Sequence, residues 1–592
     1  MGLKQGCARL DSGLCWPAIS PARPSPYAGP LLALLACALV LACYAAFARL
    51  GTAVFGNDDP GQAVYNRMAD GFLGGHLYLR RDVPPAFAQL RDPYDPAQNG
   101  PFRDPPYYLY DLSYFRGRMY AYFGAAPALL LFLPYHLLTG GYLSYKAAAL
   151  AFAAAAFLAW AWLAWDVRRR CAPAMPDWLL AAALLAFGLA GALPSLLARV
   201  DVWEVPVAAV SACGALALLA LWQAWNRPAA RVRWLALASL ALGLAIGCRP
   251  TALVLCPLLA WFLGEARQAE GRWNRRLVLA AALPLGGCLA LLGAYNYGRF
   301  GSVLDTGHRY QLAGGQYESR LTLFRPAYVW DNLRIYFLHA APWLPRFPFV
   351  GEAGPLRMSE GHSDAELTFG LLLNLPLAWC ALRSLPAARS ASGVGFAVRA
   401  VLLAAAAETA FFLAFFEANI RYEVEFLLPL LFLSVLGLIA AEAAPGGRRR
   451  LRAPWLALAA ASAAFVLGHA AHRALKARLD SYGWAMAHRQ PQAALRHIGT
   501  LLALEPANGA FHNDRGVALS VAGDAAGGMR EFARAVELDP GSSGAHCNLG
   551  FALLNHGDAA GALAQFRRSL ELDPANAGAR AGLALLRPDP AR

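Results

Sequence analysis

Long apolar runs recur along this chain of 592 residues. Each is near the length of about 20 residues that an α-helix needs to cross a bilayer. We expect about eleven such spans, at residues 28–50, 145–165, 177–195, 205–225, 233–248, 250–264, 277–295, 367–385, 397–416, 424–443 and 454–470. Only 15% of the residues are Asp, Glu, Lys or Arg, against about 25% in an ordinary soluble domain. The sequence therefore predicts an all-α, polytopic membrane protein and excludes a cytosolic enzyme, a nucleic-acid-binding module and a disordered chain.

The net charge of +14 comes largely from arginines at the ends of the apolar runs. Positively charged loops remain in the cytoplasm, so this pattern is typical of a topology signal. Arginine clusters follow alternate runs, within residues 168–170, 227–233, 267–276, 383–389 and 448–452. The basic N-terminal tail, residues 1–27, is therefore predicted to be cytoplasmic, and the run 28–50 is predicted to be an uncleaved signal anchor in the cell inner (cytoplasmic) membrane.

One further apolar segment, residues 121–138, contains Pro127 and Pro134. The arginine clusters are all cytoplasmic only if this segment does not cross, so we expect a broken interfacial or re-entrant piece. A membrane domain over residues 28–472 then has two large outer loops, at about 51–144 and 296–366. With an odd number of spans, the C-terminal part lies outside the cytoplasm.

A period of 34 residues marks the C-terminal region. Leu504-Glu505-Pro506, Leu538-Asp539-Pro540 and Leu572-Asp573-Pro574 repeat at this spacing, and Phe532 and Phe566 match between them. The pattern resembles tetratricopeptide repeats over about 475–590. It predicts two full units, a leading half unit at about 490–506 and a capping helix at about 576–587. Such a stack binds a protein partner or acceptor, although the motif specifies no ligand.

Two adjacent carboxylates, Asp58 and Asp59, directly follow the first span. Asp59 has a structural interpretation, because Asp59, Pro60 and Gln62 fit the start of a capped helix; Asp58 could simply be solvated. The functional interpretation is a carboxylate at the membrane surface that takes a proton from an acceptor hydroxyl or holds a divalent cation, Mg²⁺ or Mn²⁺.

The first outer loop continues with GFLGGHLYL from Gly71 and then an aromatic, proline-rich stretch from Pro105 to Pro127. With the acidic pair, this layout resembles the C-type glycosyltransferase superfamily, over about residues 30–445. These polytopic enzymes are similar in plan to protein O-mannosyltransferases and lipid A aminoarabinose transferases, and they use polyprenyl-phosphate sugar donors on the outer face. The pair here is Asp-Asp rather than the common Asp-Glu, which leaves open which Asp is the base; the resemblance implies Asp58, with Asp59 as its neighbour.

The resemblance implies further site residues. A second acidic position often follows the third span in this superfamily, where Asp201 and Glu204 stand. The alternative there is an interfacial pair of Arg199 with Asp201. An Arg-Tyr pair often precedes a Pro-containing helix, which makes Arg421 a candidate phosphate ligand with Tyr422 beside it.

Two other outward positions follow from the residues themselves. Arg249 interrupts an apolar hairpin, where it could hold a donor phosphate or extend to the interface. His308 and Arg309 lie among aromatics in the second outer loop, where they could recognise sugar hydroxyls or rest on lipid headgroups. A lone His is more often structural than a base.

We therefore expect a membrane glycosyltransferase of the cell envelope, which moves a hexose or pentose from a polyprenyl-phosphate donor to an acceptor on the outer face. The first alternative is an oligosaccharide ligase or polymerase of the same architecture. The second is a non-catalytic membrane scaffold that recruits envelope-assembly proteins through its repeats. No nucleic acid is expected as a partner.

Overall fold

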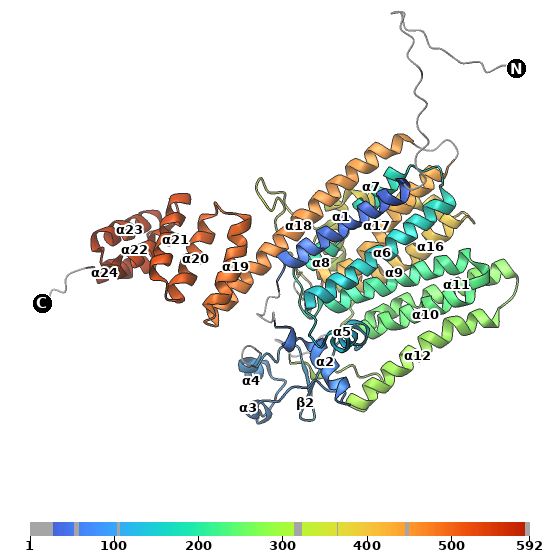
Figure 1. Ribbon diagram of the computed structural model, residues 1–592, viewed down its shortest axis with the longest axis horizontal. Helices are drawn as coiled ribbons and strands as arrows, with labels where there is room; N and C mark the ends of the chain where they lie inside the picture. Colours follow the sequence, from blue (N-terminus) through green and yellow to red (C-terminus); the bar gives the residue numbers. More distant parts are fainter. Residues whose placement is uncertain are drawn as a thin grey trace, which may run out of the picture.

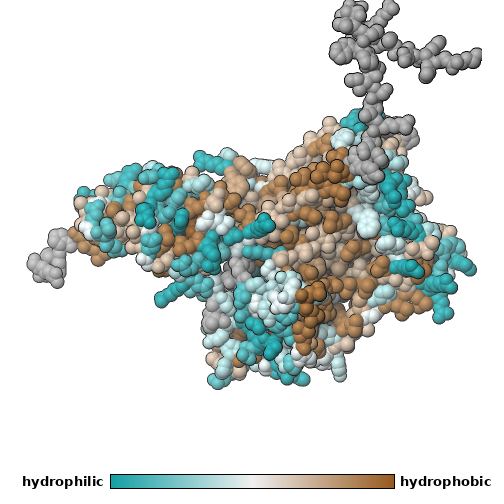
Figure 2. Space-filling view, viewed as in Figure 1, coloured by the Kyte–Doolittle hydropathy of each residue, from teal (hydrophilic) through white to brown (hydrophobic). Residues whose placement is uncertain are grey.

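The computed structural model describes residues 28–52, 59–103, 107–312, 323–363, 365–366, 368–444 and 449–586. It has a bundle of apolar helices, a cap of loops and short elements at one end of the bundle, and an arm of helical pairs (Figure 1). The bundle surface in Figure 2 is largely hydrophobic, whereas the arm and the cap are mostly hydrophilic. This division matches a membrane domain with two parts outside the bilayer.

Eight helices are long and apolar enough to cross a membrane. They are α1 (Ala28–Leu50), α6 (Tyr145–Cys171), α9 (Glu204–Asn226), α10 (Arg231–Cys248), α12 (Arg275–Phe300), α16 (Gly393–Leu413), α17 (Ile420–Ala443) and α18 (Arg452–Ala487). Each coincides with a predicted span. The all-α fold class is confirmed, since the described residues contain one small antiparallel hairpin, β1 (Ser113–Phe115) with β2 (Arg118–Tyr120).

The other three predicted spans are wrong as single helices. They form α7 (Asp177–Ala190) with α8 (Leu193–Leu197), η5 (Pro250–Leu255) with α11 (Pro257–Glu270), and α14 (Leu371–Asn374) with η8 (Pro376–Ser384) and α15 (Leu385–Ala388). A proline stands at the start of most of these pieces. Because proline lacks the N–H that an α-helix needs in its interior, the chain begins a new helix at each of them.

The segment 121–138 contains η3 (Ala128–Phe132) and α5 (Leu133–Thr139). At about 1.5 Å per residue, this pair falls well short of a hydrocarbon core of about 30 Å. It packs against α2 (Val64–Leu73) and leaves Leu137 and Leu138 exposed, as expected of an interfacial helix.

The remaining short elements belong mostly to the loops. They are η1 (Pro60–Gln62), α3 (Pro85–Ala88), α4 (Pro96–Asn99), η2 (Gly100–Phe102), η4 (Pro228–Ala230), η6 (His308–Tyr310), α13 (Pro326–Leu333), η7 (Arg334–Leu338) and η9 (Arg449–Leu451).

Helices α1 and α18 lie side by side and run in the same direction (Figure 1). The guanidinium of Arg478 in α18 donates to the last carbonyls of α1, at 3.2 Å from Arg49 O, 2.8 Å from Leu50 O and 3.4 Å from Gly51 O. An arginine at this position satisfies carbonyls that a helix C-terminus leaves without an intrahelical partner. The loop after α1 and the arm after α18 therefore leave the bundle on the same side.

The arm contains α19 (Pro491–Leu504), α20 (Gly509–Val521), α21 (Ala525–Leu538), α22 (Ser543–Asn555), α23 (Ala559–Leu572) and α24 (Ala577–Leu585). In both full repeat units a glycine lets the paired helices approach. A Cβ at Gly516 would lie 2.6 Å from the ring of Phe532, and a Cβ at Gly550 equally close to that of Phe566.

The predicted leading half unit is a complete pair. Helix α18 continues unbroken out of the bundle, and its Tyr482 and Ala485 pack with Ala494 of α19 and Ala518 of α20. The expected boundary at about 472–475 therefore falls inside α18, because one helix is both the last apolar span and the first helix of the repeats.

Candidate functional site

A cavity of about 260 Å³ lies where the loop between α1 and α6 meets the turn before α9. Its polar lining comes from segments far apart in the sequence: Gln62, Arg81, Arg103, Tyr108, Asp111, Tyr145, Asp201 and Trp203. The volume approaches the lower end of the range for small-molecule sites. Two carboxylates and two guanidiniums therefore line one space at the end of the bundle that carries the cap.

The chain just after the acidic pair is fixed to the bundle. The hydroxyl of Tyr145 accepts the amide of Val64 at 2.6 Å, and the amide of Asn66 donates to Pro60 O and Leu143 O, each at 2.8 Å. Gln62 lines the cavity between these anchors. The acidic pair is thus joined by a short, anchored segment to the cavity wall.

Asp59 begins η1, and its carboxylate accepts the amide of Gly61 at 2.8 Å, so the capping interpretation is confirmed. Asp58 lies outside the described residues. Within the described ranges, no three His, Cys, Asp or Glu side chains gather as metal ligands.

Asp111 is the buried carboxylate of the cavity. Its oxygens accept Trp203 Nε1–H and Gln311 Nε2–H, each at 2.7 Å. Burial raises the pKa of Asp111 to about 6, although both hydrogen bonds act in the opposite direction. Its φ is 59° and that of Tyr108 is 47°, in the left-handed region that non-glycine residues rarely adopt. Asp111 was not predicted as a site residue; its position in the aromatic stretch of the first loop was the available signal.

The two cavity arginines are held in place by backbone carbonyls. Arg81 donates to Tyr107 O, and Arg103 donates to Pro96 O at 2.8 Å and to Asn99 Oδ1 at 2.7 Å. Burial lowers the pKa of Arg81 to about 10, so it stays charged at neutral pH. The cavity therefore has fixed positive charge opposite its carboxylates. Neither arginine was predicted.

Of the two acidic residues predicted before α9, only Asp201 lines the cavity; its carboxylate lies 3.7 Å from Arg199. Glu204 is buried beneath it and accepts the amide of Asp201 at 2.8 Å. Its other oxygen lies 3.3 Å from Arg473, and both side chains are 1% exposed. Glu204 thus lies where it supports the turn that carries Asp201.

Both predicted phosphate ligands already have carboxylate partners. Arg249 contacts Glu425 and lies over the ring of Tyr422 at 5.1 Å. Arg421 lies 3.4 Å from Glu366, and its guanidinium lies 5.1 Å from the centre of the Trp203 ring. Both guanidiniums belong to one network beside the cavity wall, and neither is among the residues that line the cavity. Tyr422 donates its hydroxyl to Glu417 at 2.8 Å.

Glu366 joins this network from the loop between η7 and α14 and was not predicted. Its carboxylate contacts Arg199 and Arg421 and accepts the side-chain amide of Asn419. Burial alone would raise the pKa of Glu366, but Arg421 and Arg199 outweigh it and lower the pKa to about 2. No local pattern distinguishes this Glu, because its partners are long-range.

The predicted sugar-recognition pair lies apart from the cavity lining. The His308 ring meets Tyr122 edge-on at 5.7 Å, and burial lowers the pKa of His308. Arg309 is 59% exposed and pairs with Asp305 at 2.6 Å. Neither residue is among those that line the cavity.

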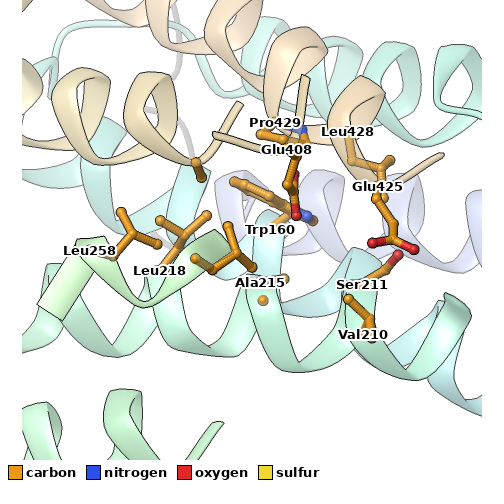
Figure 3. A pocket seen from close by; sticks show the side chains of 13 residues that line it. Trp160, Val210, Ser211, Ala215, Leu218, Leu258, Glu408, Glu425, Leu428 and Pro429 are labelled. Carbon is orange, nitrogen blue, oxygen red and sulfur yellow. The ribbon is translucent and has the colours of Figure 1, made fainter. Parts of the chain in front are cut away.

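A second, much smaller pocket of about 20 Å³ lies within the bundle. Glu425 extends toward Ser211, and Glu408 lies beside Trp160 (Figure 3). This volume suits one water molecule rather than a substrate.

Comparison with known proteins identifies the arm. A tetratricopeptide repeat family model matches residues 543–576. The Arabidopsis OM64 TPR domain matches with 21% identity over 19% of this chain and 93% of that chain, at a TM-score of 0.19. The Sgt2 TPR domain from Aspergillus fumigatus matches with 23% identity over 19% of this chain and 76% of that chain, at a TM-score of 0.19.

A larger part of the chain is similar to the Archaeoglobus fulgidus oligosaccharyltransferase tethered with an acceptor peptide. The match has 14% identity and a TM-score of 0.41, over 76% of this chain and 55% of that chain. A search of curated proteins finds no match. The chain thus carries a tetratricopeptide repeat near its C-terminus, on a bundle of apolar helices.

Proposed function

We propose that this protein is a membrane glycosyltransferase that moves a sugar from a polyprenyl-phosphate donor to an acceptor on the outer face of the inner membrane. The observation that carries the proposal is the 260 Å³ cavity, in which Asp111 and Asp201 face Arg81 and Arg103 at the outer end of the bundle. A phosphate at the bilayer surface would place its sugar at this depth. The layout of the first loop, which resembles the C-type superfamily, supports the same function.

The proposed reaction is a single displacement with inversion at the anomeric carbon. The acceptor hydroxyl attacks that carbon, the bond from carbon to phosphate oxygen breaks, and the phosphate leaves with the electron pair. Asp58 receives the hydroxyl proton, as the resemblance implies. Arg249 and Arg421 stabilise the charge that develops on the leaving phosphate.

Asp111 is a second candidate for the proton. Its pKa of about 6 places it near the range of a useful general base, because burial already makes its charged form less stable. Asp111 lines the cavity together with Asp201, so it can contact an acceptor there. Asp58 and Asp111 are therefore the two positions to test for loss of turnover.

The repeat arm is proposed to hold the acceptor protein or an assembly partner. Its support is the bond between Arg478 and the end of α1, since the arm and the first outer loop leave the bundle on the same side. A partner held by the arm is then on the side of the cavity.

The test is transfer of radiolabelled sugar from polyprenyl phosphate by the purified full chain in proteoliposomes, with envelope extract as acceptor. Asp58→Asn and Asp111→Asn should each reduce turnover by at least about a hundredfold if they are the base. Asp92→Asn is the matched control, because Asp92 is an exposed carboxylate of the same loop and is not among the residues that line the cavity. Full activity in both test variants would remove the base assignment, and no transfer from any polyprenyl-phosphate sugar would remove the proposed function.

A non-catalytic scaffold is the second candidate, and the pairing of both phosphate-ligand arginines with glutamates favours it. It predicts that the cavity carboxylates can be replaced without a phenotype in cells, whereas removal of the repeats abolishes function. A transferase requires both parts.

A further inference from the structure

The carboxylate of Glu366 occupies a set of cationic and amide donors at the start of α17. Arg199 Nη1 contacts its Oε1, while Asn419 Nδ2 and Arg421 Nη2 contact its Oε2, the latter at 3.4 Å. Asn419 is also the N-cap of α17, where it accepts the amide of Arg421 at 3.0 Å. We call Arg199, Asn419 and Arg421 the anion-binding triad.

The triad suits an anion for reasons that do not depend on Glu366 itself. Two guanidiniums provide several N–H donors in planar forks, which match carboxylate and phosphate equally well. The N-terminus of a long helix adds a partial positive charge at the same place. Asp201 and Glu417 lie farther from these guanidiniums, at 3.7 Å, and the buried Glu204 also attracts both of them.

Glu366 reaches the triad from another part of the chain and remains accessible. Its side chain is 33% exposed, whereas those of Arg199 and Arg421 are 14% and 13% exposed. Two backbone hydrogen bonds hold the residue, from Glu366 N to Ala418 O at 3.0 Å and from Ile420 N to Glu366 O at 3.4 Å. An anion from solvent or from the membrane surface can therefore approach the carboxylate that it would replace.

The triad adjoins the wall of the cavity. Arg421 stacks on Trp203, and Arg199 lies beside Asp201, and both of these partners line the cavity. A group bound by the triad would therefore be next to whatever fills the cavity.

We propose that the triad is a binding site for a phosphate group and that Glu366 is a displaceable carboxylate that fills it when no phosphate is bound. This inference rests on the proposed function, in which the phosphate belongs to the lipid carrier and the attached sugar enters the cavity. Exchange of one anion for another conserves the local charge, so the arginines keep a counter-charge throughout. Binding of phosphate then requires the Glu366 carboxylate to leave the triad, which removes the side-chain contacts that help to hold its backbone in place.

The test compares phosphate binding to the full chain in detergent, by isothermal titration with inorganic phosphate. When a ligand must displace an internal competitor, its apparent Kd equals its intrinsic Kd divided by the fraction of protein in which the competitor has left the site. If Glu366 fills the triad more than about 90% of the time, Glu366→Gln should bind phosphate at least about tenfold more tightly than the wild type.

Glu352→Gln is the matched control. It removes the same charge from the same outer loop, but Glu352 pairs with Lys476 at 3.7 Å and does not contact the triad. It should leave phosphate affinity unchanged, and Arg421→Gln should abolish phosphate binding. Equal affinity of the wild type and Glu366→Gln, or an equal gain in Glu352→Gln, overturns the proposal.

A second measurement does not need the Glu366 variant to fold. In the wild type, saturating phosphate should increase amide hydrogen exchange in peptides that contain Glu366, and should not do so in Arg421→Gln. Unchanged exchange at saturation overturns the displacement. A parallel titration with a polyprenyl monophosphate in mixed micelles identifies the source of the phosphate, because a lipid carrier should bind more tightly than the free ion.

The two proposals fail separately. Phosphate binding that tightens in Glu366→Gln without any sugar transfer would leave the anion site and remove the transferase. Sugar transfer with no change in phosphate affinity would remove only the role of Glu366.

Discussion

The buried pair of Arg473 and Glu204 offers a sharp test of how the repeats are joined to the site. Arg473 lies in α18, and its guanidinium is 3.3 Å from the Glu204 carboxylate, with each side chain 1% exposed. Within the described residues, Nε and Nη1 of Arg473 have no hydrogen-bond partner. Glu204 in turn holds the amide of Asp201 on the cavity wall.

Replacement of Arg473 by Met keeps most of the side-chain volume and removes the charge. It leaves Glu204 buried without its ion-pair partner, and removal of one partner of a buried pair costs about 3–5 kcal/mol. Replacement of both residues, as Arg473→Met with Glu204→Gln, removes the unpaired charge. The double variant should therefore be more stable than the Arg473→Met single variant, with a coupling of about 2–3 kcal/mol.

The free energy of unfolding can be measured in mixed micelles by titration with SDS, followed by circular dichroism. Arg496→Met is the matched control, because Arg496 is exposed on α19 and its replacement should change stability by less than about 0.5 kcal/mol. A decrease of less than about 1 kcal/mol in the unfolding free energy of Arg473→Met would refute the reasoning, since a buried carboxylate that has lost its ion-pair partner should cost more than this. Additive losses in the double variant would show that the two side chains do not interact.

Three further predictions concern other parts of the molecule. Because folding raises the pKa of Asp111 to about 6, the native state holds the Asp111 proton more tightly than the unfolded state does. The unfolding free energy of the wild type should therefore fall by up to about 3 kcal/mol relative to that of Asp111→Asn as the pH rises from about 4 to 6. A constant difference in unfolding free energy across this window would contradict the shift. In the repeats, Gly516→Ala should destabilise the full chain by about 1–3 kcal/mol, because the new Cβ would meet the Phe532 ring. Gly499→Ala has open space around it and should stabilise the full chain by about 0.5–1 kcal/mol. Thermal unfolding of the full chain measures both changes, and stability changes of the same sign would show that the close approach at Gly516 is absent. Finally, reporters that are active only outside the cytoplasm, inserted at residues 116–117 and fused to the C-terminus, should give the same result in intact cells, and opposite results would contradict the parallel course of α1 and α18.

Features encoded in local patterns were predicted well. The eight long spans follow from runs of apolar residues, and the repeats follow from a 34-residue period that places glycine against phenylalanine. The cap at Asp59 was also predictable, because an Asp before proline is sufficient to begin a short helix. In each case the interaction lies within a few residues or a regular spacing.

The partners of the charged residues could not be predicted in this way. Arg421 was predicted as a phosphate ligand, but its carboxylate partner Glu366 comes from a loop 55 residues earlier. Glu204 was predicted as catalytic, and its partner Arg473 is 269 residues away. Such pairs depend on how helices pack, which no local pattern records. Continuity of α18 was missed for the opposite reason, since a change in composition was interpreted as a change of domain.

Helix α18 has 36 residues in one unbroken rod, which is about 54 Å long at 1.5 Å per residue. A bilayer core uses about 30 Å of this length. The rest of the helix is a rigid connection, because its length sets the distance of the repeats from the bilayer and its rotation sets the direction in which they face. A partner bound to the arm would therefore be held at one distance and in one orientation relative to the cavity. A flexible linker would instead allow it many positions. Each residue added to or removed from this part of α18 would rotate the repeats by about 100° about the helix axis.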